Sequence, residues 1–113
     1  MIDQVHPRDL EAWLQAARAH GEPLVLDVRE PWEWQTASVR ADGFELQTLP
    51  MRVVPVRLAE LDASRPVACL CHHGGRSMQV ASFLEHHGFA HVANIAGGID
   101  AWSREIDPTI PRY

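Results

Sequence analysis

Cysteine is scarce in this chain, which has only Cys69 and Cys71 among its 113 residues. The two lie in one apolar run with a single residue between them. A disulfide there would close almost no loop and would strain the backbone. We therefore expect two free thiols, which suits a reducing compartment.

Long apolar runs and basic runs are also missing. No apolar stretch approaches the roughly 18 residues of a membrane span, and residues Met1 to Gln4 lack the basic and apolar regions of a signal peptide. We therefore expect a cytoplasmic protein that does not bind membranes. Ten Lys and Arg stand against fifteen Asp and Glu, giving a net charge of −5. This balance argues against a surface that follows nucleic-acid phosphates, so any anion must be bound locally.

The pattern of apolar residues predicts one α/β domain over residues 1–113. Hydrophobic residues make up 46% of the chain, enough for one core without disulfides or metal. Predicted strands and helices alternate, which favours a parallel sheet of about five strands flanked by helices on both faces. The predicted strands are 24–28, 44–49, 67–71 and 91–95. The predicted helices are 7–20, 31–36, 53–61, 77–88 and 99–106.

A candidate reaction centre lies where the strand ending at Cys71 meets a glycine loop. Open parallel sheets bind ligands beyond the carboxyl ends of their strands. The two glycines allow backbone N–H groups to turn inward, and the next helix, expected to begin near Ser77, directs its positive dipole end to the same space. These groups and the nearby Arg76 favour a reactive thiolate and a small bound anion such as thiosulfate or a persulfide.

The segment from Cys71 to Ser77 resembles the active-site loop of the rhodanese family, Cys-x-x-Gly-x-Arg-Ser/Thr. Residues 26–30 with Glu33 are similar to the family's first signature. Residues 95–99 with Trp102 and Pro108 are similar to its Gly-Gly-x-x-x-Trp signature. Segment 37–50 departs from the family pattern, which affects the pocket rim and hence the choice of acceptor.

The resemblance implies a single rhodanese-like domain with no cofactor. Its activity would be transfer of a sulfane sulfur from thiosulfate or a persulfide donor to cyanide or a thiol, including a possible thiol protein, through a persulfide on Cys71. Cys71 is the predicted catalytic residue. The predicted substrate-binding residues are His72, His73, Gly74, Gly75, Arg76, Ser77 and Arg29.

Several alternatives stay open at this stage. Arg29 either lines the pocket or pairs with Glu30 or Glu33 on the surface. The domain could instead be a non-catalytic module that binds a partner. A cysteine phosphatase or arsenate reductase is disfavoured, because related phosphatases need a longer loop than the four residues between the cysteine and the arginine here.

A zinc site is disfavoured as well. Its ligands would be Cys69, Cys71, His72 and His73. Four ligands so close in sequence cannot readily surround a tetrahedral ion while two of them belong to a strand. The prediction is therefore a site without metal.

Overall fold

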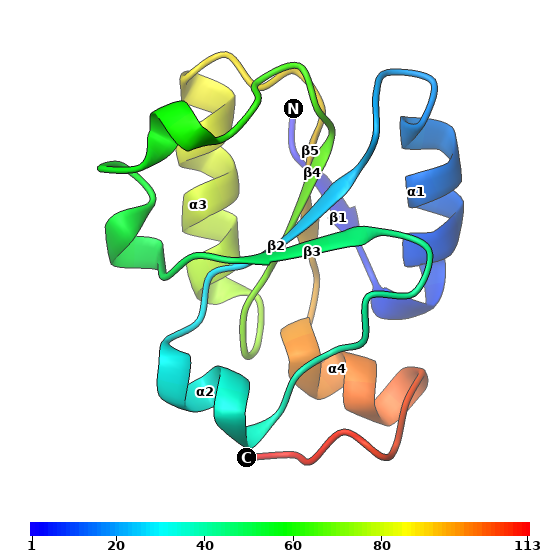
Figure 1. The fold of residues 1–113 in the computed structure, drawn as a ribbon. Helices are drawn as coiled ribbons and strands as arrows, with labels where there is room; N and C mark the ends of the chain where they lie inside the picture. The colour runs from blue at the N-terminus through cyan, green and yellow to red at the C-terminus, as the bar shows by residue number, and fades with distance from the viewer.

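A computed structural model describes residues 1–113, and its centre is a sheet of five parallel strands (Figure 1). The strands are β1 (Asp3–Val5), β2 (Leu24–Asp27), β3 (Glu45–Thr48), β4 (Val67–Leu70) and β5 (Val92–Ile95). Their order in the sheet is β1-β5-β4-β2-β3. The chain runs outward from β2 to β3 and then returns to β4 on the other side of β2. Open α/β sheets bind ligands at the carboxyl ends of the strands beside such a reversal.

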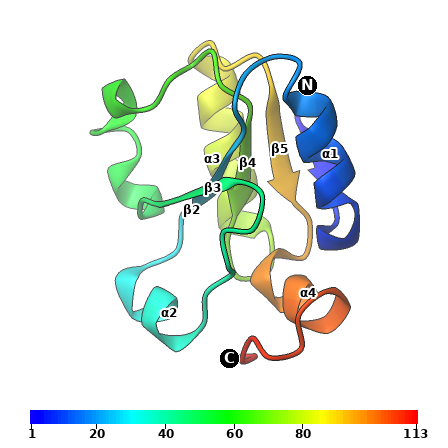
Figure 2. The same ribbon diagram turned by 45° about the vertical axis from the view of Figure 1, so that its right-hand side comes forward.

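Helices cover both faces of the sheet (Figure 2). Helices α1 (Leu10–Ala17) and α4 (Gly98–Glu105) pack on one face, and α3 (Gly75–His86) packs on the other. The short helix α2 (Pro31–Thr36) follows β2, and three 3-10 turns are η1 (Pro7–Asp9), η2 (Met51–Val53) and η3 (Leu58–Glu60). This arrangement confirms the predicted α/β class, the parallel sheet and the helices on both faces.

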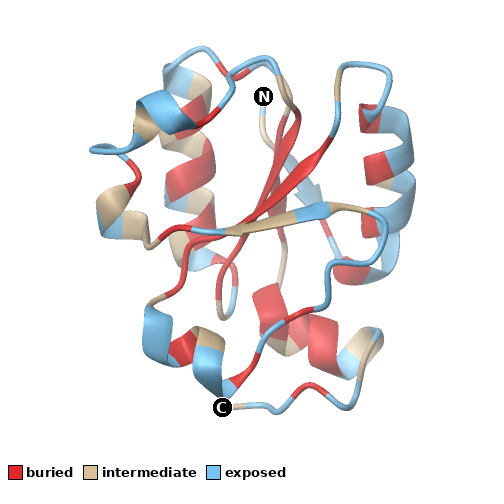
Figure 3. Ribbon diagram, in the orientation of Figure 1, coloured by how far each residue is buried: buried red, intermediate tan, exposed pale blue.

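Two hydrophobic cores form because successive side chains of a strand point to opposite faces. Leu26 and Cys69 pack toward α3, whereas Val25 and Ala68 pack toward α1 and α4. Every residue of β2, β4 and β5 is buried (Figure 3). Burying one Leu or Val side chain stabilises a fold by about 1.5–3 kcal/mol, so the central strands are held firmly from both sides.

Strand β1 is the element that the sequence pattern does not reveal. Asp3 and Gln4 are exposed and only Val5 is buried, so the segment has no apolar run to mark it. It lies at the edge of the sheet and pairs with β5 alone.

The helix predicted over residues 53–61 is wrong. The segment begins at the last residue of the 3-10 turn η2 and contains the separate turn η3. Pro55 lies between them, and a proline inside a helix removes a hydrogen bond and clashes with the preceding turn. Helix α3 begins at Gly75, earlier than the predicted start near Ser77. No helix of the protein is both long enough and apolar enough to cross a membrane.

Candidate active site

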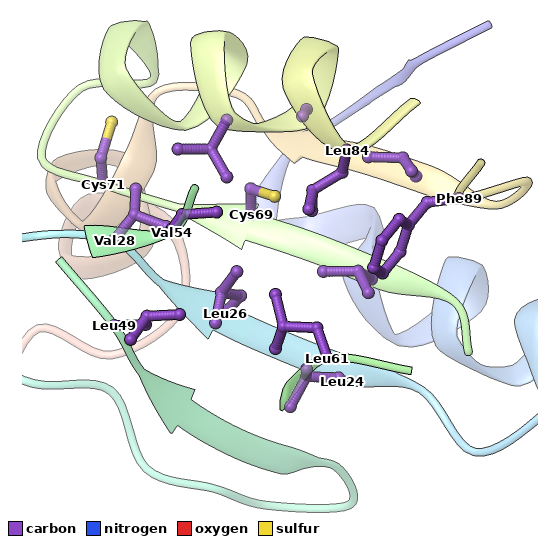
Figure 4. Packing of buried hydrophobic residues seen from close by; sticks show 14 residues of the cluster. Leu24, Leu26, Val28, Leu49, Val54, Leu61, Cys69, Cys71, Leu84 and Phe89 are labelled. Atoms are coloured by element: carbon purple, nitrogen blue, oxygen red, sulfur yellow. The ribbon is translucent and has the colours of Figure 1, made fainter. Parts of the chain in front are cut away.

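Cys71 lies directly after β4, in the loop that leads to α3. Its side chain is at the end of the core cluster next to α3, whereas Cys69 lies within that cluster (Figure 4). Both thiols are free, as the sequence predicts. Burial raises the pKa of the Cys69 thiol well above its usual range, so Cys69 is a packing residue.

The sulfur of Cys71 contacts two polar groups. The backbone N–H of Gly74 donates to Sγ at 3.1 Å, and Ser77 Oγ lies 3.2 Å from Sγ. Gly74 has a backbone φ of +106°, a conformation that residues other than glycine rarely adopt. This turn directs the Gly74 N–H at the sulfur of Cys71. The residues that follow form the first turn of α3, whose N–H groups have no partner within the helix.

Backbone contacts with the start of α4 hold the cysteine loop in place. The N–H of Ile99 donates to the carbonyl of Cys71 at 2.9 Å, and the N–H of Asp100 donates to that of His72 at 3.1 Å. A Cβ on Gly98 would lie 2.4 Å from both carbonyl oxygens. Gly98 therefore permits the close approach of two loops, a role that sequence reasoning missed because it treated the glycine pair as a turn.

Arg76 is held by Glu33 of α2. Nη1 and Nη2 of Arg76 donate to the two carboxylate oxygens at 2.6 and 2.8 Å, and the Tyr113 hydroxyl donates to Oε2 at 2.6 Å. The guanidinium holds the pKa of Glu33 at about 2, although burial opposes this shift. Burial and the bond to Glu33 raise the pKa of Tyr113 to about 12. Glu33 is thus ionised and Tyr113 neutral across ordinary pH.

Arg29 does not line a pocket, which corrects the prediction that it binds substrate. Its side chain is fully buried and donates to both oxygens of Asp27, the shortest contact being 2.7 Å. It also donates to the Ala37 carbonyl at 2.8 Å and to the Tyr113 hydroxyl at 2.9 Å. The surface pairing with Glu30 or Glu33 side chains is wrong too. Arg29 joins β2 to the segments after α2 and α4.

His72 and His73 lie at the mouth of the loop, one half-buried and one exposed. The ring of His72 is stacked between those of His73 and Tyr113, with both centroid distances 3.9 Å. Burial lowers the pKa of His72, and the neighbouring charge of His73 lowers it further. The buried Nε2 of His72 has no hydrogen-bond partner.

Asp100 lies beside His72 and His73, and these three residues could in principle bind a metal ion. One potential ligand atom from each residue lies within 4.8 Å of the others. The histidine rings are within 25° of parallel, so their lone pairs run side by side instead of converging. Asp100 is already paired with Arg104 and Arg112 at 3.3 and 3.0 Å. These residues do not form a suitable coordination sphere.

One surface cavity lies away from the Cys71 loop. It has a volume of about 770 Å³ and is bounded by α1, residues 40–44 and α4, with Leu14, Phe44 and Trp102 among its apolar residues. Its lining includes no cysteine, serine, threonine or lysine. The thiol, its hydrogen-bond donors and the start of α3 meet instead at the Cys71 loop.

Comparison with known proteins agrees with this geometry. The chain matches the rhodanese-like domain family over residues 10–105. It is 37% identical to the chloroplastic rhodanese-like/PpiC domain-containing protein 12 of Arabidopsis thaliana, covering 99% of this chain and 38% of that protein. It is 32% identical to a sulfurtransferase of Allochromatium vinosum, covering 97% and 96% of the two chains.

Other relatives are much longer than this chain. The probable adenylyltransferase/sulfurtransferase MoeZ of Mycobacterium tuberculosis is 30% identical, and the match covers 96% of this chain but 26% of MoeZ. The chain thus spans well under half of the Arabidopsis and Mycobacterium proteins.

Solved structures share the fold. The rhodanese-related protein from Thermoplasma volcanium superposes with a TM-score of 0.74 at 27% identity, covering 98% of this chain and 99% of that one. The rhodanese-like domain protein from Staphylococcus aureus gives a TM-score of 0.75 at 21% identity, covering 99% of each. With a family match over most of its length and a relative matched nearly end to end, the chain belongs to the rhodanese-like domain family.

Proposed function

We propose that the protein is a sulfurtransferase that carries a sulfane sulfur as a persulfide on Cys71. The observation that carries the proposal is the position of Cys71 Sγ, which accepts the Gly74 N–H at 3.1 Å beside the first turn of α3. Such donors stabilise a sulfur anion as an oxyanion hole stabilises an oxygen anion. Relatives named as sulfurtransferases support the same reading.

In the first step, the Cys71 thiolate attacks the outer sulfur of thiosulfate. The new Sγ–S bond forms as the S–S bond of thiosulfate breaks, and sulfite leaves with the bonding electron pair. A persulfide donor reacts in the same way and releases its thiolate. In both cases the transferred sulfur keeps one negative charge, and no cofactor is required.

In the second step, an acceptor nucleophile attacks the terminal sulfur of the persulfide. A cyanide acceptor is released as thiocyanate, and a thiolate acceptor is released as a new persulfide. In both cases the S–S bond of the Cys71 persulfide breaks, and Cys71 keeps the bonding electron pair as a thiolate. We expect a thiol to be the acceptor in a reducing cytoplasm. Because longer relatives carry this domain as one part of the chain, a protein thiol is a reasonable acceptor.

Substrate binding is assigned to the loop itself. The backbone of Gly74, Gly75 and Ser77 supplies N–H donors for the transferred sulfur. Arg76 donates two hydrogen bonds to the Glu33 carboxylate, but 32% of the Arg76 side chain remains exposed. Its outer edge can therefore still meet a sulfonate, with His72 and His73 bordering the entrance.

The test is thiosulfate-dependent formation of thiocyanate, together with intact mass after loading with thiosulfate. Cys71→Ser should abolish turnover and the mass increase of one sulfur atom. Cys69→Ala is the matched control, since Cys69 lies in β4 only two residues before Cys71 and packs in the same core cluster. Turnover that survives Cys71→Ser would exclude Cys71 as the nucleophile.

The second candidate is a module that binds a partner without turnover. It is favoured by the same relatives in which the domain is a minor part of a long chain. Loading of Cys71 without release to cyanide or small thiols would support this reading. Absence of loading from both thiosulfate and a small persulfide would contradict both.

A further inference from the structure

Hydrogen bonds link Cys71 through Ser77 and Asn94 to Gln4, which is exposed on β1. Ser77 Oγ lies 3.2 Å from Cys71 Sγ and 2.6 Å from Asn94 Oδ1. The amide nitrogen of Asn94 lies 3.3 Å from the Gly74 carbonyl and 3.0 Å from Gln4 Oε1. Ser77 is fully buried, and Cys71 and Asn94 are nearly so, so water does not replace these partners.

The orientation of the Asn94 amide follows from its backbone neighbour. A carbonyl oxygen can only accept, so the end of the amide that faces the Gly74 carbonyl must be the NH₂ group. The opposite end, Oδ1, therefore faces Ser77 and can only accept. The Ser77 hydroxyl, which has one proton, must donate it to Asn94.

Because Ser77 donates its proton to Asn94, it cannot donate a hydrogen bond to the Cys71 sulfur at the same time. While Ser77 donates to Asn94, it presents only a lone pair to Cys71, which suits a neutral S–H group. A thiolate is stabilised by hydrogen-bond donors, and the Gly74 N–H is then the one group that donates to Sγ. For Ser77 to stabilise the thiolate, its hydroxyl must rotate away from Asn94 and give up the 2.6 Å bond.

We propose that Asn94 is a positioning residue that limits the thiolate form of Cys71 by competing with the sulfur for the Ser77 proton. This deepens the proposed function, since the thiolate is the attacking species in sulfur loading. When Cys71 ionises, its proton passes to solvent, the Ser77 O–H turns to Sγ, and Asn94 Oδ1 loses its donor. Asn94 thereby lowers the reactivity of the resting cysteine.

The substitution Asn94→Leu tests this competition, since it removes the acceptor at similar volume. The Gly74 carbonyl keeps a partner, because the N–H of Met78 donates to it at 3.2 Å. With its proton free, Ser77 should donate to the sulfur and increase the thiolate fraction at neutral pH by about tenfold. Alkylation by iodoacetamide should then be about threefold faster, because more acidic thiols are intrinsically weaker nucleophiles.

The decisive control is the Ser77→Ala background. If Asn94 acts through the Ser77 proton, adding Asn94→Leu to Ser77→Ala should leave the alkylation rate at Cys71 unchanged. Gln4→Leu removes an outer bond of the Asn94 amide without touching Ser77, and should react like the natural protein. The rate is followed on the Cys71 peptide by mass, with buried Cys69 as an internal reference.

Asn94→Ala, which has a smaller side chain than Asn94→Leu, serves as a second variant. Circular dichroism and thermal unfolding show which of the variants are folded. An unchanged or slower rate in both folded variants, or an equal increase without Ser77, would overturn the proposal. The measurement needs no sulfur donor. Failure of sulfur transfer and failure of this inference are therefore separate results.

Discussion

The guanidinium of Arg76 and the carboxylate of Glu33 form a two-point ion pair, with N–O distances of 2.6 and 2.8 Å. The arginine comes from the first turn of α3, and the glutamate comes from α2. Glu33 is almost completely buried, whereas Arg76 is about one-third exposed. The ion pair thus connects the cysteine loop to helix α2.

The free energy of unfolding should fall at acid pH as Glu33 becomes protonated. Its pKa is about 2 in the folded protein against an ordinary value of 4.5, so its stabilisation is complete above pH 4.5 and is lost as the pH falls toward 2. Since one pKa unit corresponds to about 1.4 kcal/mol, this group can account for up to about 3.5 kcal/mol of unfolding free energy.

Urea unfolding of Glu33→Gln between about pH 2 and 6 measures this contribution. The variant should be less stable at neutral pH, and its curve should approach that of the natural protein near the acid end. The lowered pKa values of Asp100 and Asp107 affect both proteins equally, so the difference isolates Glu33. Two parallel curves would contradict the assignment.

Gly98→Ala should displace the cysteine loop. The added Cβ would lie 2.4 Å from the carbonyl oxygens of Cys71 and His72, and Gly98 has φ of +60°. We expect a loss of about 2–4 kcal/mol in unfolding free energy and at least about tenfold in sulfur transfer. Gly88→Ala is the control, because Gly88 has φ of +92° but no atom within 4 Å of an added Cβ. Equal effects of the two changes would mean that backbone strain alone is responsible.

Arg29→Met should destabilise the protein strongly, because it leaves the Asp27 carboxylate buried without its partner. Removing one member of a buried pair costs about 3–5 kcal/mol. The double variant Arg29→Met/Asp27→Leu should recover part of this loss. Arg57→Met removes the exposed pair with Glu60 and should change the unfolding free energy little. A small effect of Arg29→Met in denaturant unfolding would contradict a structural role.

The sequence alone determined the fold class and the position of the candidate active-site loop. Apolar runs of strand length, separated by helical patterns, identify the buried strands, because burial on both faces requires continuous apolar residues. The loop after Cys71 is equally local, since its glycines, arginine and serine lie within seven residues of chain. Local residue type and order are sufficient for such features.

Only the tertiary structure decided which partners the charged and polar residues take. Glu33 and Arg76 are 43 positions apart, and Tyr113 lies 80 positions from Glu33. The burial of Arg29, the close approach of Gly98 to the cysteine loop and the bond between Ser77 and Asn94 likewise depend on residues from different segments of the chain. Periodicity specifies which face of an element is buried but not which distant side chain lies opposite it. That pairing depends on strand order, which brings the ends of β2, β4 and β5 to one edge of the sheet.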